Sequence, residues 1–155
     1  MAAFEEVVMC LAAFYGFDLG IKLEKLAELS RMVQEISRQR VQGWKPVVGH
    51  TVFVETADSH LERILLGRGT KAVDRAKWSV FGMKPEAIGQ QIQLVFGPQA
   101  LVGRGIKAKA KTMNIDLSDD EFEEITKTMK EGFKTKGGLS EEEMEKLIKR
   151  VAKRR

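Results

Sequence analysis

Few side chains in this chain are suited to acid–base or nucleophilic chemistry at neutral pH. The sequence holds two histidines, His50 and His60, and a single cysteine, Cys10. Neither histidine is accompanied by carboxylates at the spacing of a metal site, and no G-x-S-x-G, P-loop or dinucleotide-binding motif is present. The residue types alone therefore predict no metal site and no cofactor site in this chain.

Cys10 lies in an apolar helical pattern, and no candidate base is near it in the sequence. We expect it to be buried as a small hydrophobic residue rather than to act as a nucleophile. One cysteine cannot form an internal disulfide, so a cytoplasmic location is the default expectation. The first charges, Glu5 and Glu6, differ from the basic start of a secretory signal peptide.

The composition is that of a globular protein of mixed charge. Of the 155 residues, 43% are hydrophobic and 31% are charged, and 26 basic residues are mixed with 22 acidic ones. The basic stretches "KAKAKT" and "KRVAKRR" leave nucleic-acid binding as a minor hypothesis, because no aromatic residues are interleaved with them. Complementation of helix dipoles explains these charges more simply.

Two long helices are predicted near the start of the chain, over residues 2–15 and 23–38. The first is apolar around most of its circumference, and the second has an apolar stripe opposite a charged face. Such a wide apolar surface needs cover on more than one side, which indicates a partner. We expect self-association, with a C2 dimer as the first form to consider.

The rest of the chain predicts shorter elements and then a helical pair. Residues 51–54 and 91–96 favour strands, residues 59–66 and 106–113 favour helices, and the basic segment 67–77 favours a mobile loop. Ser118 with Glu121, and Ser140 with Glu143, fit the capping box that starts a helix. These two boxes predict helices over residues 119–133 and 141–153, and the whole pattern predicts a mostly helical α+β fold.

Four segments resemble, in collinear order, the region that follows the catalytic barrel in acyl-CoA-dependent condensing enzymes, the isopropylmalate, homocitrate and citramalate synthases. They are "AAFEEVVMCLAAFYGFDLGIKLEKLAELSRMVQEIS", "KPVVGHTVFVETADSHLERIL", "WSVFGMKPEAIG" and "NIDLSDDEFEEITKTMKEGFKTKGGLSEEEMEKLI". The resemblance implies three parts: a last barrel helix and linker in residues 1–45, a small mixed α/β lid subdomain in residues 46–105, and a small helical subdomain, ending in a helical hairpin, in residues 106–155.

The same resemblance implies a C-terminal, non-barrel subunit or fragment of an acyltransferase that is not active alone. In the family, the residues that bind the divalent metal belong to the barrel, so the metal is expected in a partner barrel chain. The implied partners are that barrel chain and a second copy of this chain through the N-terminal helices, with acyl-CoA and a 2-oxo acid bound only in the complex.

His60 matches the histidine of the family's "SGIH" motif, which lies on a lid over the active site of a neighbouring subunit and takes part in acid–base steps. An imidazole suits proton transfer at neutral pH. The chain departs from the family at Glu55, where the family has histidine, at Asp58, where it has glycine, and at Trp78, where it has tyrosine. Asp58 adds an acid near His60 in the sequence. We take His60, with Glu55 and Trp78, as the candidate catalytic residues.

Two interpretations stay open. In the first, the chain completes a barrel and supplies a lid whose His60 assists catalysis or serves structure. In the second, it is a degenerate, non-catalytic binding or regulatory module that self-associates. The departures from the family at Glu55 and Trp78 favour this second interpretation.

Overall fold

The computed structural model describes residues 2–68 and 81–153, which form two compact units. The first unit spans Met1–Val54 and Phe81–Ile92, and the second spans Glu55–Val80 and Gln93–Arg155. Most of the predicted loop over residues 67–77 lies outside the described residues. The division into three segments inferred from the sequence stays a prediction.

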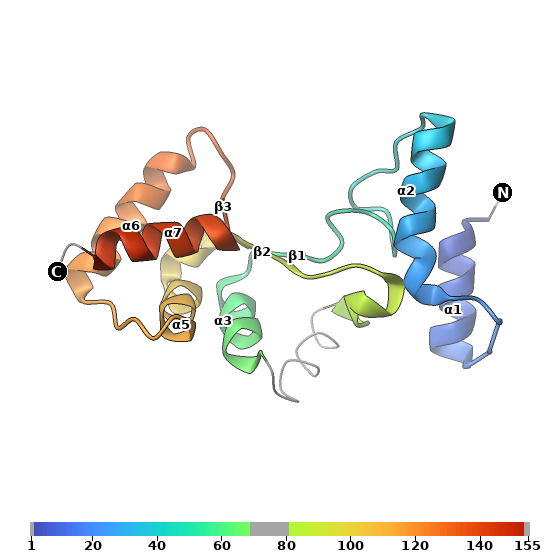
Figure 1. Cartoon of the computed structure of the whole chain (residues 1–155), viewed down its shortest axis with the longest axis horizontal. Helices are drawn as coiled ribbons and strands as arrows, with labels where there is room; N and C mark the ends of the chain where they lie inside the picture. Colours follow the sequence, from blue (N-terminus) through green and yellow to red (C-terminus); the bar gives the residue numbers. More distant parts are fainter. Residues whose placement is uncertain (1, 69–80, 154–155) are drawn as a thin grey trace. The chain divides into compact units, whose positions relative to one another are not determined.

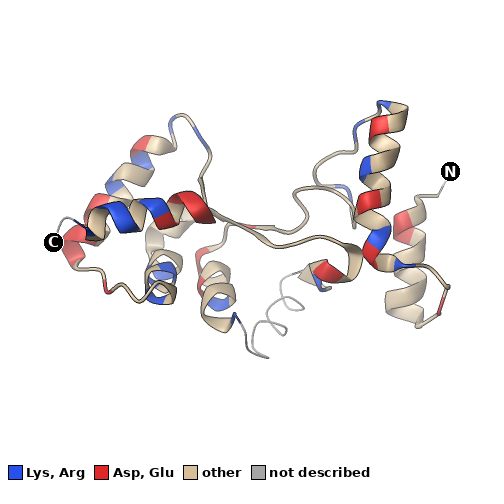
Figure 2. Ribbon diagram, viewed as in Figure 1, with Lys and Arg blue, Asp and Glu red and all other residues tan. Residues whose placement is uncertain are grey.

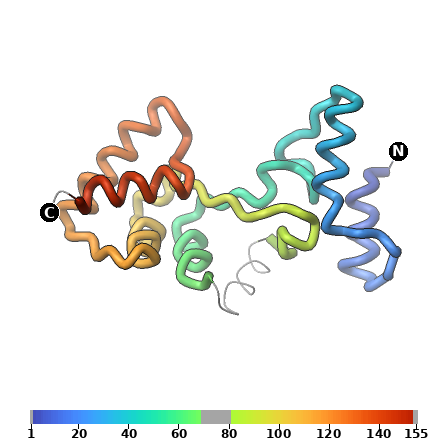
Figure 3. Tube along the Cα trace, in the orientation of Figure 1, coloured from blue at the N-terminus to red at the C-terminus, as the bar shows by residue number. Residues whose placement is uncertain are grey.

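The first unit contains both predicted N-terminal helices (Figure 1). Its helical elements are α1 (Phe4–Tyr15), η1 (Leu23–Lys25), α2 (Leu26–Ser37) and η2 (Pro85–Ile88). Gly16 ends α1 with a φ of +69°, a left-handed conformation that glycine adopts without strain. After α2 the chain runs back as a loop alongside that helix, coloured cyan to teal in Figure 3.

The core of the first unit joins residues from both of its segments. Its buried side chains are Val8, Met9, Leu26, Val47, Phe53 and Ile88. Phe53 also packs edge-to-face on Phe81, with ring centroids 5.4 Å apart. Because Ile88 and Phe81 come from the second segment, this core is completed only by residues far along the chain.

The prediction that Cys10 is buried is wrong, because its side chain is exposed. Val8 and Met9 are the buried residues of α1, and successive residues of an α-helix are turned by about 100° around its axis. Cys10 therefore lies about 200° from Val8, on the side of α1 that no described residue covers. The apolar pattern identified the helix correctly, but not which side of it this chain buries.

The second unit combines a small sheet with four α-helices described in the structure (Figure 1). The strands β1 (Val54–Glu55), β2 (Gln93–Phe96) and β3 (Leu139–Ser140) lie in the order β1-β2-β3, and Phe96 pairs with Leu139 in the antiparallel β2–β3 ladder. The remaining elements are α3 (Asp58–Gly67), η3 (Pro98–Val102), α5 (Arg104–Thr112), α6 (Asp119–Gly132) and α7 (Glu141–Ala152).

Both predicted capping boxes are confirmed. The hydroxyl of Ser118 accepts from the Glu121 N–H while the Glu121 carboxylate accepts from the Ser118 N–H, and Ser140 and Glu143 repeat the pattern in α7. A hydrogen bond from Lys136, together with those from Ser140, lowers the pKa of Glu143 to about 2. The mostly helical α+β fold is likewise confirmed.

Residues 51–54 depart from the predicted strand. Only Val54 belongs to β1, and Thr51, Val52 and Phe53 form a turn in which Phe53 enters the core.

Within the described residues, no helix combines the length and the apolar character that crossing a bilayer requires.

Helices α3 and α5 pack closely because Gly105 has no side chain. A Cβ atom at this position would lie 2.9 Å from the Cβ of Leu61 and 3.2 Å from the Asp58 Oδ1 atom. Leu61 and Ile106, on either side of this contact, are fully buried. The close approach therefore fixes how α3, the helix that carries His60, lies against α5.

Replacing Gly105 with alanine should lower the free energy of unfolding by about 1–3 kcal/mol, because the added methyl group overpacks the α3–α5 contact. Urea denaturation followed by circular dichroism measures the change. The control is Gly132→Ala, at the end of α6, where a Cβ would meet nothing within 4 Å. Equal stability of the Gly105→Ala variant and the wild type would show that α3 and α5 do not pack this closely.

Candidate functional site

His60 lies in the first turn of α3 and contacts the carboxylate of Glu55 from β1. Its Nδ1 atom is 2.9 Å from Glu55 Oε2. The Glu55 side chain is 9% exposed, whereas that of His60 is 37% exposed. One end of the imidazole is thus held by a buried acid while the ring still reaches the surface.

Backbone groups hold the Glu55 carboxylate in place. Its Oε1 atom accepts hydrogen bonds from the N–H groups of Thr56, at 2.8 Å, and Ala57, at 2.7 Å. These donors lie at the junction between β1 and α3, so the local chain path creates the site. With Oε1 occupied, Oε2 is directed to His60.

This contact sets which nitrogen of His60 can exchange a proton. An ionised carboxylate only accepts hydrogen bonds, so Nδ1 of His60 carries the hydrogen that bonds Glu55. The Nε2 atom is then the ring nitrogen that can accept a proton. The pair has the form of an oriented general base, in which one residue transfers the proton and the other orients it and stabilises its cation.

Asp58, which the sequence places near His60, has a different task. Its Oδ2 atom accepts from the Arg104 N–H at 3.0 Å, and its Oδ1 atom accepts from the Gly105 N–H at 2.8 Å. The side chain therefore caps the N-terminus of α5, where unpaired N–H groups favour a negative charge. The acid that contacts His60 is Glu55, not Asp58.

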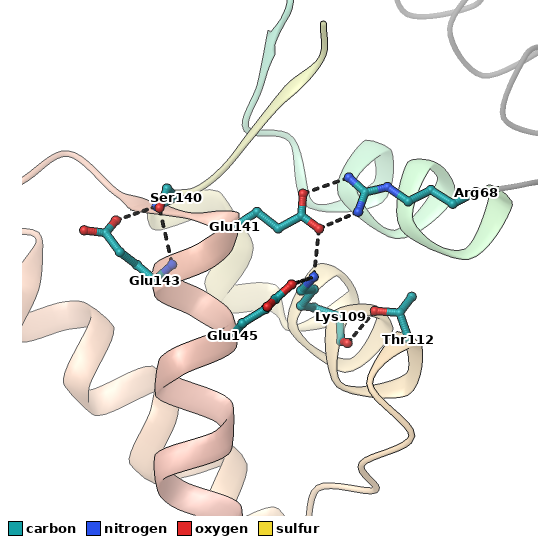
Figure 4. Close-up of polar contacts among 7 residues, drawn as sticks. All are labelled: Arg68, Lys109, Thr112, Ser140, Glu141, Glu143 and Glu145. Atoms are coloured by element: carbon teal, nitrogen blue, oxygen red, sulfur yellow. Dashed lines mark hydrogen bonds and ion pairs between the residues drawn. The ribbon is translucent and has the colours of Figure 1, made fainter.

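An ionic cluster binds the far end of α3 to α5 and α7 (Figure 4). Arg68, directly after α3, donates to both carboxylate oxygens of Glu141, with the Nη2–Oε2 distance at 2.7 Å. The buried ammonium of Lys109 donates to Glu141 at 2.7 Å and to Glu145 at 2.5 Å. No sequence pattern indicates this cluster, because Arg68 and Glu141 are 73 residues apart.

The cluster keeps Glu141 ionised. Burial raises the pKa of its carboxyl group, but hydrogen bonds from Arg68 and Lys109 outweigh burial and hold the pKa below its usual value of 4.5. A lowered carboxyl pKa stabilises the fold above the pKa of the unfolded chain, and this stabilisation is lost as the pH falls through the folded-state pKa.

Glu141→Gln should lower Tm at pH 7 by about 2–4 °C, because Arg68 and Lys109 lose a shared anion whose side chain is only 24% exposed. The difference from the wild type should be full above pH 4.5 and shrink below it. Thermal denaturation between pH 3 and pH 8 measures both. Glu142→Gln is the control, since the Glu142–Lys146 pair is exposed. A Tm difference that did not change with pH would contradict the assignment.

The remaining candidate residues lie elsewhere. Trp78 is outside the described residues. His50 belongs to the first unit and is exposed. Among the described residues, no group of three His, Cys, Asp or Glu side chains could hold a metal ion. The structure thus brings together two of the three candidate catalytic residues, Glu55 and His60.

Known proteins resemble most or all of this chain. It is 35% identical over 130 residues to a putative (R)-citramalate synthase of Methanopyrus kandleri, covering 83% of the chain and 23% of that protein. It is 31% identical over 154 residues to a homocitrate synthase of Methanocaldococcus jannaschii, and the match covers 99% of this chain and 36% of that protein. A 2-isopropylmalate synthase of the same organism is 32% identical over 133 residues, and the match covers 83% of this chain and 24% of that protein. No protein-family model matches the chain.

These relatives define the family. The chain belongs to the C-terminal region of the citramalate, homocitrate and isopropylmalate synthase family. It spans between 23% and 36% of the length of these relatives. The resemblance seen in the sequence is therefore confirmed for the family and for the region.

Proposed function

We propose that this chain is the C-terminal, non-barrel part of a metal-dependent synthase that condenses a 2-oxo acid with an acyl-CoA. The names of the relatives, and the small share of their length that the chain spans, support this proposal. In it, the chain completes a barrel and supplies a lid over the active site, and the barrel binds the divalent metal. A separately encoded subunit and a piece of a longer protein fit it equally well.

The pairing of His60 with Glu55 is the observation that carries the proposal. Condensation at an acyl-CoA methyl group requires removal of a proton from that carbon. The Nε2 atom of His60 would form the new N–H bond as the C–H bond breaks, and the electron pair would pass to the thioester carbonyl as an enolate. Glu55 would stabilise the resulting imidazolium through the 2.9 Å contact at Nδ1.

The exposed apolar surface of the first unit supports a partner. On α1 and α2 the exposed large apolar side chains are Phe4, Val7, Phe14, Tyr15, Leu29, Met32, Val33 and Ile36. Figure 2 shows that α1 carries little charge beyond its acidic first turn. Apolar surface of this extent is rare on monomers. We assign it to the barrel chain and to a second copy of this chain, in a reducing cytoplasm where the exposed thiol of Cys10 stays free.

The same surface favours a second candidate function, a non-catalytic module that only self-associates. In that case the Glu55–His60 pair would be structural, and no barrel would be needed to cover α1. The two functions differ in whether a barrel chain accompanies this one and in whether His60 is needed for turnover.

His60→Ala should lower kcat by about 10²- to 10⁴-fold, the usual contribution of a positioned acid or base. The tagged chain is purified from its own cells, and CoA release is measured with acetyl-CoA and a panel of 2-oxo acids. The control is Lys127→Ala, on the exposed side of α6. Unchanged turnover in His60→Ala would leave the subunit role but remove His60 from the chemistry. An inactive homodimer without a barrel chain would favour the self-associating module.

Glu55→Gln should change the tautomer of His60, and this can be tested on the isolated chain without a partner. In the neutral imidazole of the wild type, long-range ¹H–¹⁵N correlations should show hydrogen on Nδ1 and none on Nε2, because Glu55 accepts from Nδ1. In the variant the Nε2–H form should gain population. His50, in the other unit, serves as the internal reference. The same tautomer in both proteins would show that Glu55 does not orient the ring.

A further inference from the structure

A basic hollow lies in the first unit between α2 and the loop that follows it. Its volume is about 570 Å³, and its lining includes Arg31, Glu35, Arg38, Arg40, His50 and Gln90. This volume is within the usual range for small-molecule sites and exceeds what a single phosphate ion needs. All of these residues belong to one compact unit.

The charges in the hollow are unbalanced. Arg31 and Glu35 lie four residues apart on one face of α2, Arg38 comes directly after the helix, and Arg40 follows two residues later. Among the described residues, none of the three guanidinium groups forms an ion pair, and Glu35 is the one acid in the lining. Three cations thus face one anion.

A solvated helix face would explain part of this pattern. Arg38 and Arg40 lie at the C-terminus of α2, where a positive charge complements the helix dipole. That effect is confined to the last turn, so it does not account for Arg31, which lies about two turns earlier. The helix dipole also does not explain why the surface is concave, with a loop opposite α2 that is held in place by specific contacts.

The wall opposite α2 is held by specific contacts. Gln34 on α2 accepts from the Val41 N–H at 2.9 Å, and Gln90 donates to the Val47 carbonyl at 2.8 Å. Val47 has a φ of +69°, a strained value for a β-branched residue. Gly49 is packed so closely that a Cβ would lie 2.3 Å from the Gly43 carbonyl oxygen. The hollow is therefore preformed, which reduces the entropy lost when a ligand binds.

We propose that this hollow binds a small molecule with at least two linked phosphate groups, of the size of a nucleoside diphosphate. Arginine forks match phosphate oxygens in pairs, and three of them can contact adjacent phosphates. The ring of His50, which also lines the hollow, can donate a further hydrogen bond to a phosphate oxygen. This site lies outside the Glu55–His60 pair and does not depend on the proposed function.

Calorimetric titration of the full chain with pyrophosphate, and separately with ADP, tests the proposal at low salt. We expect one saturable site per chain and at least a tenfold weaker Kd in the double variant Arg38→Gln/Arg40→Gln, because both residues line the hollow and are exposed. The matched control, Lys22→Gln/Lys111→Gln, removes the same charge from exposed positions outside the hollow. Its Kd should stay within about twofold of the wild type.

A second pair of variants tests the location by a gain in affinity. Glu35→Gln removes the one acid in the lining and should tighten pyrophosphate binding about threefold, whereas Glu123→Gln, exposed on α6, should change it little. Three results would overturn the proposal: no saturable binding of either probe, equal weakening in both double variants, or equal affinity for citrate and pyrophosphate. The last result would show that the hollow does not select phosphate.

Discussion

The close contact between α3 and α5 determines where His60 lies. At this contact Gly105 leaves room for Leu61, and the carboxylate of Asp58 caps the first N–H groups of α5. The first turn of α3 is therefore anchored to the start of another helix. His60 occupies that same turn, and the Glu55 carboxylate is held by the chain immediately before it. Packing and capping thus place both members of the pair.

Local patterns predicted the elements of the fold well. The two S-x-x-E boxes gave the starts of α6 and α7, because a capping box depends only on residues three apart. The apolar periodicity gave α1, α2 and α3 for the same reason. It did not give the buried side of α1, which depends on what packs against the helix, and Cys10 was therefore assigned to the wrong side.

The candidate site was predicted in part. His60 and Glu55 were both singled out from the sequence, but their contact depends on the turn between β1 and α3, which residue types do not specify. Asp58 was equally close in sequence and points instead to α5. The cluster around Lys109 and the positive φ of Val47 had no sequence pattern at all, because each depends on residues brought together by tertiary structure.

The 73-residue separation between Arg68 and Glu141 has a consequence for how the protein is made. A ribosome releases α3 well before α7, so the C-terminal end of α3 waits for its ionic partner until the last helix has emerged. Contacts between distant segments form late because a long loop must close first. In the meantime Lys109 is a cation without its two carboxylates. The C-terminal end of α3, the helix that carries His60, therefore gains its ionic contact with α7 only after all of the intervening segment has been synthesised.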